Sequence, residues 1–240
     1  MKFLLYNIRY GTGRRIRWGW LDMLRRTTAH LPEIARFIDG CNPDIVGLVE
    51  IDSGSYRSGR RNQAEELAAK IGHYHACRSK YRERGMFSRL PVLNKQANAF
   101  LTRDVIRNKT FHYFERGFKR LVIELEMNTV NLFLVHLALF YRTRHHQLAD
   151  LYDLVRESKK PCVVAGDFNA FSGEHELRLF LSATGLRSVN VEHLPTHPSW
   201  APRRELDFVM YSPGLRLRSF RMPRVLLSDH LPMLCDFEME

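Results

Sequence analysis

The chain has 240 residues, of which 45% are hydrophobic and 26% charged, a composition typical of soluble globular proteins. No apolar run reaches the length of a membrane span. Asn7 and Arg9 interrupt the short apolar run at the start, so we interpret it as a first strand rather than a signal peptide. The 4 cysteines are widely spaced without a CxxC pair, which favours reduced thiols and a cytoplasmic location.

The formal net charge of +11 favours polyanionic partners such as nucleic acid, acidic membranes or phosphorylated small molecules. The alternative is that the arginines reflect genomic composition and solubility. A basic segment at Arg14–Arg26 contains Trp18 and Trp20, which suit stacking on bases or a membrane surface, or else pack on the domain as a surface loop. A second basic loop is predicted at Arg78–Arg89. Charge alone selects no substrate, and no obligatory protein partner is evident.

The first half of the chain predicts three strands and two helices. The strands are expected at Phe3–Arg9, Asp44–Val49 and Ala97–Thr102, and the helices at Pro32–Ile38 and Ala64–Ile71. Gly40 and Gly72 are expected to stop the helices. The strands carry or lead into the polar residues Asn7, Asn98 and Glu50. Asn7 suits a cap or turn, and equally an oxygen ligand or a phosphate contact.

The second half predicts further strands around two more helices. The strands are expected at Leu121–Glu126, Val130–His136, 162–165, Leu206–Tyr211, Leu215–Phe220 and Leu231–Phe237. The helices have apolar faces formed by Leu148, Leu151, Tyr152 and Val155, and by Leu177, Phe180 and Leu181. His136 ends one strand, Asp207 starts another, and Asp229–His230 precede the last. A lone histidine such as His136 is more often structural than catalytic. Without a linker or repeat, we expect one domain over residues 1–240.

Residues 162–170, CVVAGDFNA, are the most informative stretch. A buried strand is expected to stop at Gly166, where a glycine allows a sharp turn. Asp167 and Asn169 should then point the same way, with Phe168 turned into the core. A carboxylate and an amide at the carboxyl end of a central strand are typical of a ligand site in α/β sheets. The alternative is an Asx turn.

In chain order, these strand-end polar residues resemble those of the endonuclease/exonuclease/phosphatase superfamily, whose fold is that of pancreatic deoxyribonuclease. The matching segments are LLYNIRYG, PDIVGLVEID, NAFLTR, ERGFKRLVIELE, LFLVHLALF, VVAGDFNA, THPSWAPRRELDFV and LSDHLPM. GDFN followed later by SDHLP is specific, whereas the other segments are weaker alone. The resemblance implies an α/β (α+β) four-layer sandwich, in which two packed mixed β-sheets are flanked by helices. It also implies divalent-metal hydrolysis of a phosphoester.

The resemblance further implies a role for each matching residue. Glu50 and Asn7 would hold Mg²⁺, with Mn²⁺ as an alternative ion and Asp229 as a further ligand. Asp167 would orient or deprotonate the attacking water. The other catalytic positions are Asn169 as a donor to phosphate, His230 on the scissile phosphate, Asp207 holding that histidine, and His136 as a phosphate ligand or proton donor. The substrate-binding positions are Asn98, Trp200 and Arg142.

These roles agree with the chemistry of an anionic phosphodiester, which repels hydroxide unless a hard cation offsets the charge. The leading hypothesis is a Mg²⁺-dependent phosphodiesterase acting on nucleic acid. Phospholipid, sphingomyelin or a small phosphate ester is the alternative substrate, and a catalytically silent polyanion-binding module is the alternative of another class. Some abasic-site endonucleases of the superfamily have a tyrosine and an asparagine where this chain has His136, which disfavours abasic-site repair.

Overall fold

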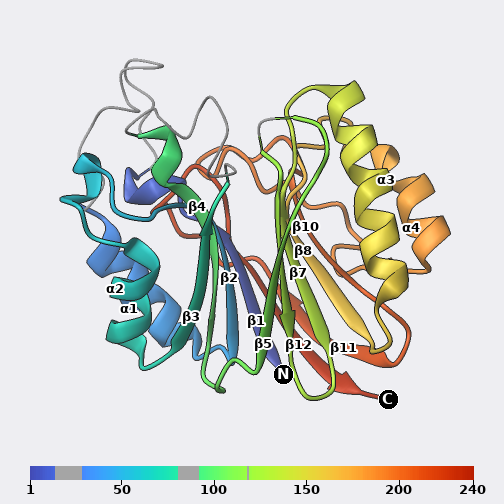
Figure 1. Cartoon of the computed structure of the whole chain (residues 1–240), viewed down its shortest axis with the longest axis horizontal. Coiled ribbons are helices and arrows are strands. Elements are labelled where there is room, and N and C mark those ends of the chain that lie inside the picture. Colours follow the sequence, from blue (N-terminus) through green and yellow to red (C-terminus); the bar gives the residue numbers. More distant parts are fainter. Residues whose placement is uncertain (14–28, 81–91, 118) are drawn as a thin grey trace.

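The computed structural model describes residues 1–13, 29–80, 92–117 and 119–240. Two six-stranded mixed sheets pack face to face at the centre (Figure 1). Helices α1 (Leu31–Cys41) and α2 (Gln63–Ile71) cover one sheet, and α3 (Tyr141–Glu157) and α4 (Arg178–Thr184) cover the other. The predicted four-layer sandwich is therefore confirmed.

The first sheet has the strand order β11-β12-β1-β2-β4-β3, and only β1 and β2 among its neighbouring strands run parallel. Its strands are β1 (Lys2–Asn7), β2 (Ile45–Asp52), β3 (Tyr74–Ser79), β4 (Gln96–Thr102), β11 (Leu215–Arg221) and β12 (Met233–Met239). With β12 on one side and β4 on the other, β1 and β2 lie at the centre of the sheet. Their carboxyl ends therefore emerge from its middle.

The second sheet has the order β5-β6-β7-β8-β10-β9, and β7 and β8 form its parallel pair. Its strands are β5 (Asn108–Tyr113), β6 (Leu121–Glu126), β7 (Asn131–His136), β8 (Cys162–Asp167), β9 (Arg187–Ser188) and β10 (Asp207–Tyr211). Glu126 pairs with Asn131, so the predicted strands at Leu121–Glu126 and Val130–His136 form an antiparallel hairpin. Here too the parallel pair is central.

Three apolar layers hold the sandwich together, and alternation along β1 shows how one strand serves two of them. Phe3 and Leu5 point into the layer between the sheets, whereas Leu4 and Tyr6 point toward α1 and α2. This period of two is the geometry of an extended strand with both faces buried. The third apolar layer lies between the second sheet and helices α3 and α4. No helix among the described residues is long and apolar enough to cross a membrane.

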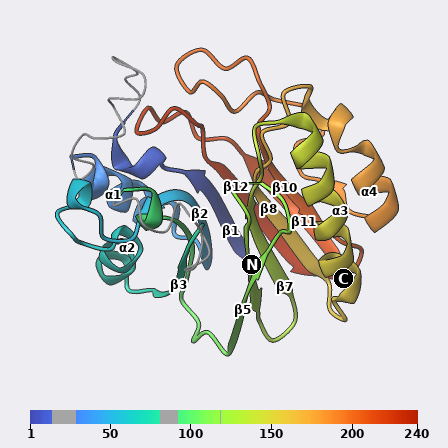
Figure 2. The same ribbon diagram turned by 45° about the horizontal axis from the view of Figure 1, so that its top comes forward.

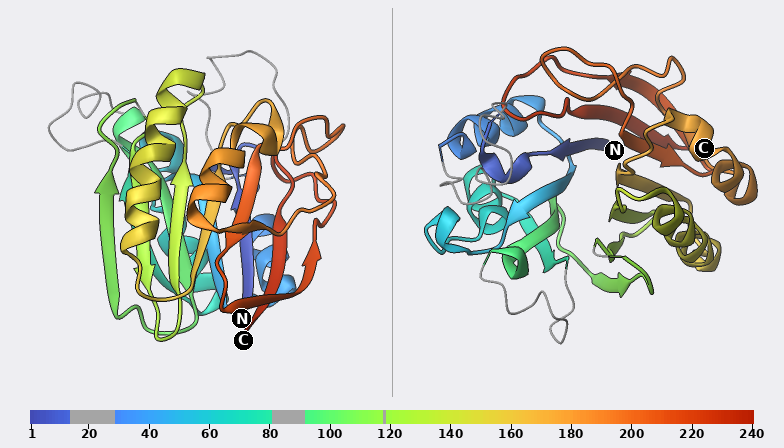
Figure 3. Two further views of the ribbon diagram at one scale, coloured as in Figure 1. Left: turned by 90° about the vertical axis from the view of Figure 1, so that its right-hand side faces the viewer. Right: turned by 90° about the horizontal axis from the view of Figure 1, so that it is seen from above.

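One edge of the sandwich gathers the polar strand ends. The carboxyl ends of β1, β2, β7 and β8 reach this edge, and antiparallel pairing brings the amino ends of β4, β10 and β12 to the same side. Both chain termini lie at the opposite end of the sheets (Figure 3), and the polar edge comes toward the viewer in Figure 2. The fold thus brings together side chains that are far apart in sequence.

The element predictions need several corrections, among them the last strand, which runs from Met233 to Met239 rather than from Leu231 to Phe237. Helix α1 continues through Gly40 to Cys41 and ends at Asn42, which adopts the left-handed conformation with φ 51°. The first strand ends at Asn7, because Arg9 begins a 3₁₀ turn, η1 (Arg9–Gly11). Arg78 belongs to strand β3 rather than to a loop, and the predicted basic loop beyond Lys80 lies largely outside the described residues. Strands β3, β5 and the two-residue β9 were not predicted, because they are edge strands with few buried residues.

Gly166 serves a different purpose from the one predicted. Strand β8 continues through it to Asp167, and the left-handed turn occurs later, at Asn169, where φ is 48°. A Cβ atom on Gly166 would lie 2.0 Å from the backbone oxygen of Val135 on the neighbouring strand. The glycine is therefore required by the close approach of β7 and β8, which aligns His136 with Asp167.

We predict that Gly166→Ala lowers the free energy of unfolding by about 3 kcal/mol or more, because the methyl group must displace backbone of β7. Gly40→Ala is the matched control. Gly40 lies within α1, and a Cβ added there would meet no heavy atom of a neighbouring residue within 4 Å, so alanine should stabilise the protein by roughly 0.5–1 kcal/mol. Urea titrations of both variants measure the difference, and equal effects would contradict the close-approach explanation.

Candidate active site

A hydrogen bond between the two sheets marks the centre of the site. Asn7, the last residue of β1, donates from Nδ2 to Oδ2 of Asp167, the last residue of β8, over 3.1 Å. Both side chains are buried. The Oδ1 atom of Asn7 accepts from the backbone N–H of Arg9 at 3.0 Å, which fixes the amide orientation. The segments LLYNIRYG and VVAGDFNA, far apart in the chain, thus meet at one point.

Asp167 and Asn169 do lie together, as the GDFN pattern predicted. The backbone N–H of Asn169 donates to Asp167 Oδ1 at 3.0 Å, and Asn169 Nδ2 donates to the Leu137 carbonyl at 2.9 Å. Phe168 between them is fully buried. Burial and the neighbouring Asp207 raise the pKa of Asp167 to about 6, although His230 opposes this. Asp167 is therefore a carboxylate whose proton affinity suits a general base near neutral pH.

His230 and Asp207 form a tight buried pair beside Asp167. The Nδ1 atom of His230 lies 2.6 Å from Asp207 Oδ2. Burial alone would lower the pKa of His230, but attraction to Asp207, the hydrogen bond and the further carboxylates Asp167 and Asp229 raise it to about 10. The imidazole is therefore positively charged at neutral pH, with Nε2–H left to donate to a substrate oxygen.

The segment THPSW holds this pair from behind. The Thr196 hydroxyl oxygen accepts from the backbone N–H groups of Leu206 and Asp207, each at 3.2 Å. The Ser199 hydroxyl donates to the Ser228 carbonyl at 2.6 Å, and its backbone N–H donates to the Asp229 carbonyl at 2.7 Å. Two small polar residues of one loop thus position Asp207 and the Asp229–His230 step.

Glu50 reaches the site through an irregularity in β2. The register between β2 and β4 shifts by one residue between Leu48 and Ile51, and Glu50 adopts φ 57° within this bulge. Its backbone N–H donates to Asn98 Oδ1 at 3.4 Å, and Asn98 Nδ2 is buried with no hydrogen-bond partner among the described residues. Burial opposes ionisation of Glu50, but Lys80 and Lys119 nearby lower its pKa.

His136 lies between two lysines that sequence reasoning missed. Its Nδ1 is 2.9 Å from Lys80 Nζ, and its Nε2 contacts Lys119 Nζ. The same Nε2 is 3.4 Å from Asp167 Oδ2 and 3.8 Å from Glu50 Oε1. Burial, Lys119 and Lys80 lower the pKa of His136, so it is neutral at pH 7 and suits the phosphate-ligand role better than donation from an imidazolium. Burial lowers the pKa of Lys80 to about 7, with Lys119 adding to the shift while Glu50 opposes it.

The structure brings further groups to the edge. Arg9 Nε lies 3.3 Å from Asp229 Oδ2, and the buried Tyr6 hydroxyl has no hydrogen-bond partner among the described residues. Burial and Asp229 raise the pKa of Tyr6. The His197 ring centroid is 4.8 Å from that of His230. The sequence feature that could have pointed to Tyr6 and Arg9 is their position in the matching segment LLYNIRYG, on either side of Asn7.

Two of the predicted substrate-binding residues, Trp200 and Arg142, have less direct contact with the catalytic residues than Asn98 has. Trp200 is 44% exposed and follows Ser199, which is bonded to the Asp229 carbonyl. Arg142 is exposed in the first turn of α3, and no hydrogen bond or ion pair joins it to another described residue of the site. Trp18 and Trp20 lie outside the described residues.

The residues that are present fit a hard divalent cation. Asp167 and Asp207 present carboxylate oxygens within 4.8 Å of each other, and the Glu50 and Asp167 carboxylates both face Nε2 of His136, at 3.8 and 3.4 Å. Asp207 Oδ1 is buried and accepts no hydrogen bond from any described residue. Carboxylate and amide oxygens, including those of Glu50, Asn7 and Asp229, are the ligands that Mg²⁺ and Mn²⁺ prefer.

Comparison with known proteins decides the family. The model of the Endonuclease/Exonuclease/phosphatase family matches residues 4–230. The chain belongs to this family. Its members hydrolyse phosphate esters and include both nucleases and phosphatases.

Among curated proteins, a UPF0294 protein of Vibrio cholerae is 34% identical over 118 residues, which are 48% of this chain and 41% of that protein. The match therefore spans about two fifths of the relative's length. The human Nocturnin catalytic domain with bound sulfate anion superposes with a TM-score of 0.70 at 21% identity, over 100% of this chain and 94% of that one. A mannosyl-6-phosphatase of Bacteroides thetaiotaomicron gives 0.73 at 13% identity, over 100% of both chains. At these identities the structures establish the fold.

The Asp207–His230 pair predicts how stability depends on pH. The folded pKa of His230 is about 10, above its ordinary value of 6.5, so its contribution is full below pH 6.5 and is lost as pH rises through 10. Between pH 6 and 10, and without metal, we expect the free energy of unfolding of the wild-type protein to fall. The fall should exceed that of His230→Gln by up to roughly 4 kcal/mol. Urea unfolding in chelator measures this, and parallel pH curves would contradict the raised pKa.

Proposed function

We propose that this chain is a divalent-metal-dependent phosphodiesterase that cleaves nucleic acid. The observation that carries the proposal is the charged His230, held at 2.6 Å by Asp207, beside the high-pKa carboxylate Asp167. The charged His230 can stabilise negative charge, and the Asp167 carboxylate can accept a proton. Hydrolysis of a phosphoester needs both at the same phosphorus centre.

The protein residues have distinct parts in this proposal. His230 Nε2–H donates to a non-bridging oxygen of the scissile phosphate, and Asp207 holds its ring in one orientation. Asp167, fixed by Asn7 and by the Asn169 backbone, orients the attacking water and accepts its proton. Neutral His136 and the ammonium of Lys119 bind a second phosphate oxygen.

Glu50, Asn7 and Asp229 would hold Mg²⁺ or Mn²⁺ at the edge of the sheets. Such an ion, when bound, supplies Lewis-acid charge to the phosphate as negative charge develops there. The bulge in β2 supports the assignment of Glu50, because it places the carboxylate within 3.8 Å of His136 Nε2, where the phosphate would be bound. Asn98, whose Nδ2 is buried and unpaired among the described residues, supports Glu50 from β4 and has a donor left for substrate.

The net charge of +11 supports nucleic acid as substrate. In this proposal the chain acts in the cytoplasm as a single domain, without an obligatory protein partner.

One observation favours a second candidate, a phospholipid or sphingomyelin. Leu139 and Phe140, between β7 and α3, are 54% and 73% exposed, and Tyr141, the first residue of α3, is 58% exposed. An apolar turn beside the site would suit a lipid surface, to which the Trp18–Trp20 segment would add.

We predict that Asp167→Asn and Glu50→Gln each lower kcat by about 10²- to 10⁴-fold on single-stranded DNA, because each removes an ionised oxygen from the reaction centre. Asp153→Asn, the same change at an exposed position of α3, is the matched control and should leave kcat unchanged. Excess EDTA should abolish turnover and Mg²⁺ or Mn²⁺ should restore it. No turnover in any of the four proteins, or turnover that is metal-independent and equal in all four and so does not come from this site, would contradict the enzymatic proposal and favour a non-enzymatic polyanion-binding module.

Salt separates the substrate classes. If a polynucleotide is bound through several phosphates, kcat/KM should fall steeply between about 50 and 200 mM NaCl, because counterions are released on binding. Hydrolysis of bis-p-nitrophenyl phosphate, which carries one charge, should fall little and serves as the control. A flat salt profile for DNA, with faster turnover of sphingomyelin vesicles, would favour the lipid substrate instead.

A further inference from the structure

A hollow of about 530 Å³ lies beside the candidate active site, on the side of the second sheet. Its lining includes Phe171, His175, Arg178, His193, Arg203 and Arg204, and we call it the arginine pocket. Phe171 comes two residues after Asn169, and the lining residue Glu205 comes two residues before Asp207. At about 3.5 Å per residue, these walls begin within roughly 7 Å of the catalytic side of the chain.

The two segments that form the pocket are tied to each other. The backbone N–H of Phe168 donates to the Leu206 carbonyl at 2.8 Å, so the chain after Asp167 and the chain before Asp207 leave the sheet side by side. The segment at Gly173–Glu176 (η6) then leads into α4. The pocket is therefore a lateral extension of the active-site edge.

The charge of the pocket is unbalanced toward positive. Its buried carboxylate, Glu205, is already bonded to Asn190 Nδ2 at 2.6 Å and to His193 Nδ1 at 3.3 Å, and Glu174 lies 3.8 Å from the same histidine. The exposed residues Arg178, Arg203 and Arg204 form no ion pair with any described carboxylate. Some arginines elsewhere in the described chain are neutralised by carboxylates, as the buried Arg144 is by Glu176.

Phe171 gives the pocket an aromatic wall. Its side chain is 43% exposed although its neighbours Ala170 and Phe168 are fully buried. The Arg204 guanidinium lies 5.2 Å from the ring centroid and that of Arg144 lies 5.7 Å from it. Arg144 is itself fixed by the Ala138 and Leu139 carbonyls at 3.0 and 2.8 Å. The ring is thus held at the rim of a cationic hollow with part of its surface open.

We propose that the arginine pocket is a subsite for the single-stranded nucleic acid that flanks the scissile phosphate. A base stacks on the open surface of Phe171 while the adjoining phosphates bind Arg204 and Arg203. An aromatic face combined with arginines that have no carboxylate partner is the recognition chemistry of single strands, since every base has a π-face and every linkage an anion. The subsite rests on the proposed nuclease function, whose substrate it specifies as unpaired polynucleotide.

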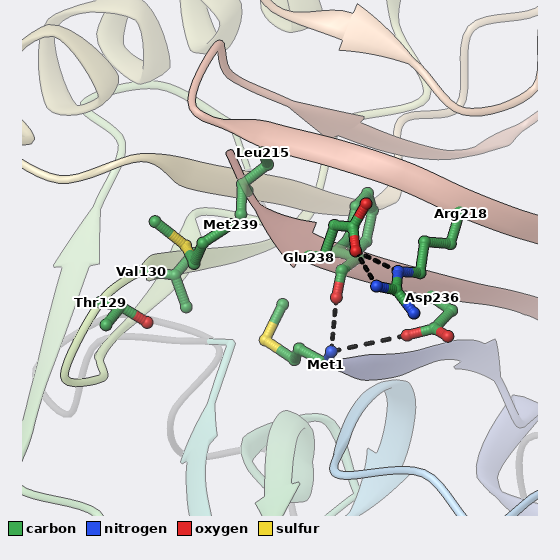
Figure 4. A pocket seen from close by; sticks show the side chains of 9 residues that line it. Met1, Thr129, Val130, Leu215, Arg218, Asp236, Glu238 and Met239 are labelled. Carbon is green, nitrogen blue, oxygen red and sulfur yellow. Dashed lines mark hydrogen bonds and ion pairs between the residues drawn. The ribbon is translucent and has the colours of Figure 1, made fainter.

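The hollow at the opposite end of the sheets lacks this chemistry. There Arg218 pairs with Glu238, and the Met1 amino group pairs with Asp236 at 3.5 Å (Figure 4). Its charges are therefore compensated within the protein, and it lies beside both termini rather than beside Asp167. Of these two hollows, the arginine pocket is the one whose arginines have no described carboxylate partner.

Binding without turnover tests the proposal. In EDTA, the anisotropy of a labelled single-stranded DNA of about 12 nucleotides reports Kd for wild type, Phe171→Ala, Arg204→Gln and the control Arg36→Gln, an exposed arginine on α1 at the far side of the molecule. We expect Kd to rise about 10-fold in the first two variants and to change little in the control. The slope of log Kd against log salt should decrease by ~0.7 in Arg204→Gln but not in Phe171→Ala, since only the arginine contacts a phosphate.

The outcomes separate the subsite from the proposed function. If wild type cleaves DNA but the Phe171 and Arg204 variants match Arg36→Gln in Kd and in KM, the subsite is wrong and the nuclease function stands. If wild type cleaves no nucleic acid but the variants lose oligonucleotide binding with the expected slopes, the subsite stands and the function fails. Loss of binding to phosphatidylglycerol vesicles, with oligonucleotide binding unchanged, would overturn the proposal in favour of a lipid headgroup site.

Discussion

The hydrogen bond from Asn7 to Asp167 is the contact on which the rest of the site depends, because it joins the last residues of two strands in different sheets. It forms only if the sheets pack closely and in register. Gly47 permits the close packing, since a Cβ there would lie 3.1 Å from Leu134 on the facing sheet. Gly166 likewise permits β7 to approach β8. The apolar layer between the sheets therefore fixes the polar edge above it.

The electrostatics of this edge follow from shared burial. Removal from water raises the pKa of Asp167 and lowers that of Lys80 and of His136, so each group is brought toward neutrality. Two groups are held in their charged forms instead: the pKa of His230 rises because Asp207 lies against it, and that of Glu50 falls because Lys80 and Lys119 are nearby. A neutral histidine and a charged histidine thus occupy one site. In the proposed mechanism, that difference in protonation between His136 and His230 would provide separate groups for phosphate binding and for charge stabilisation.

Two carboxylates that look alike in sequence have separate tasks. Glu50 is partly buried in the β2 bulge and faces His136, whereas Asp52, two residues later, is fully buried and accepts from Ser55, Ser58 and Arg57. Asp52 closes the loop after β2 and is a structural residue. The resemblance pointed to Glu50 as the site carboxylate, and the one-residue register shift in β2 is the physical reason that Glu50, rather than Asp52, faces His136.

The sequence by itself determined the family, the four layers and the strand-end positions of Asn7, His136, Asp167 and Asp207, because buried strands and the motifs GDFN and SDHLP are local signals. It also predicted Asp207 as the partner of His230. Only the tertiary structure decided the roles of Lys80 and Lys119, the bulge at Glu50 and the arginine pocket. These depend on contacts between segments far apart in the chain, and a lysine in a polar segment carries no local sign that folding will bury it against a histidine.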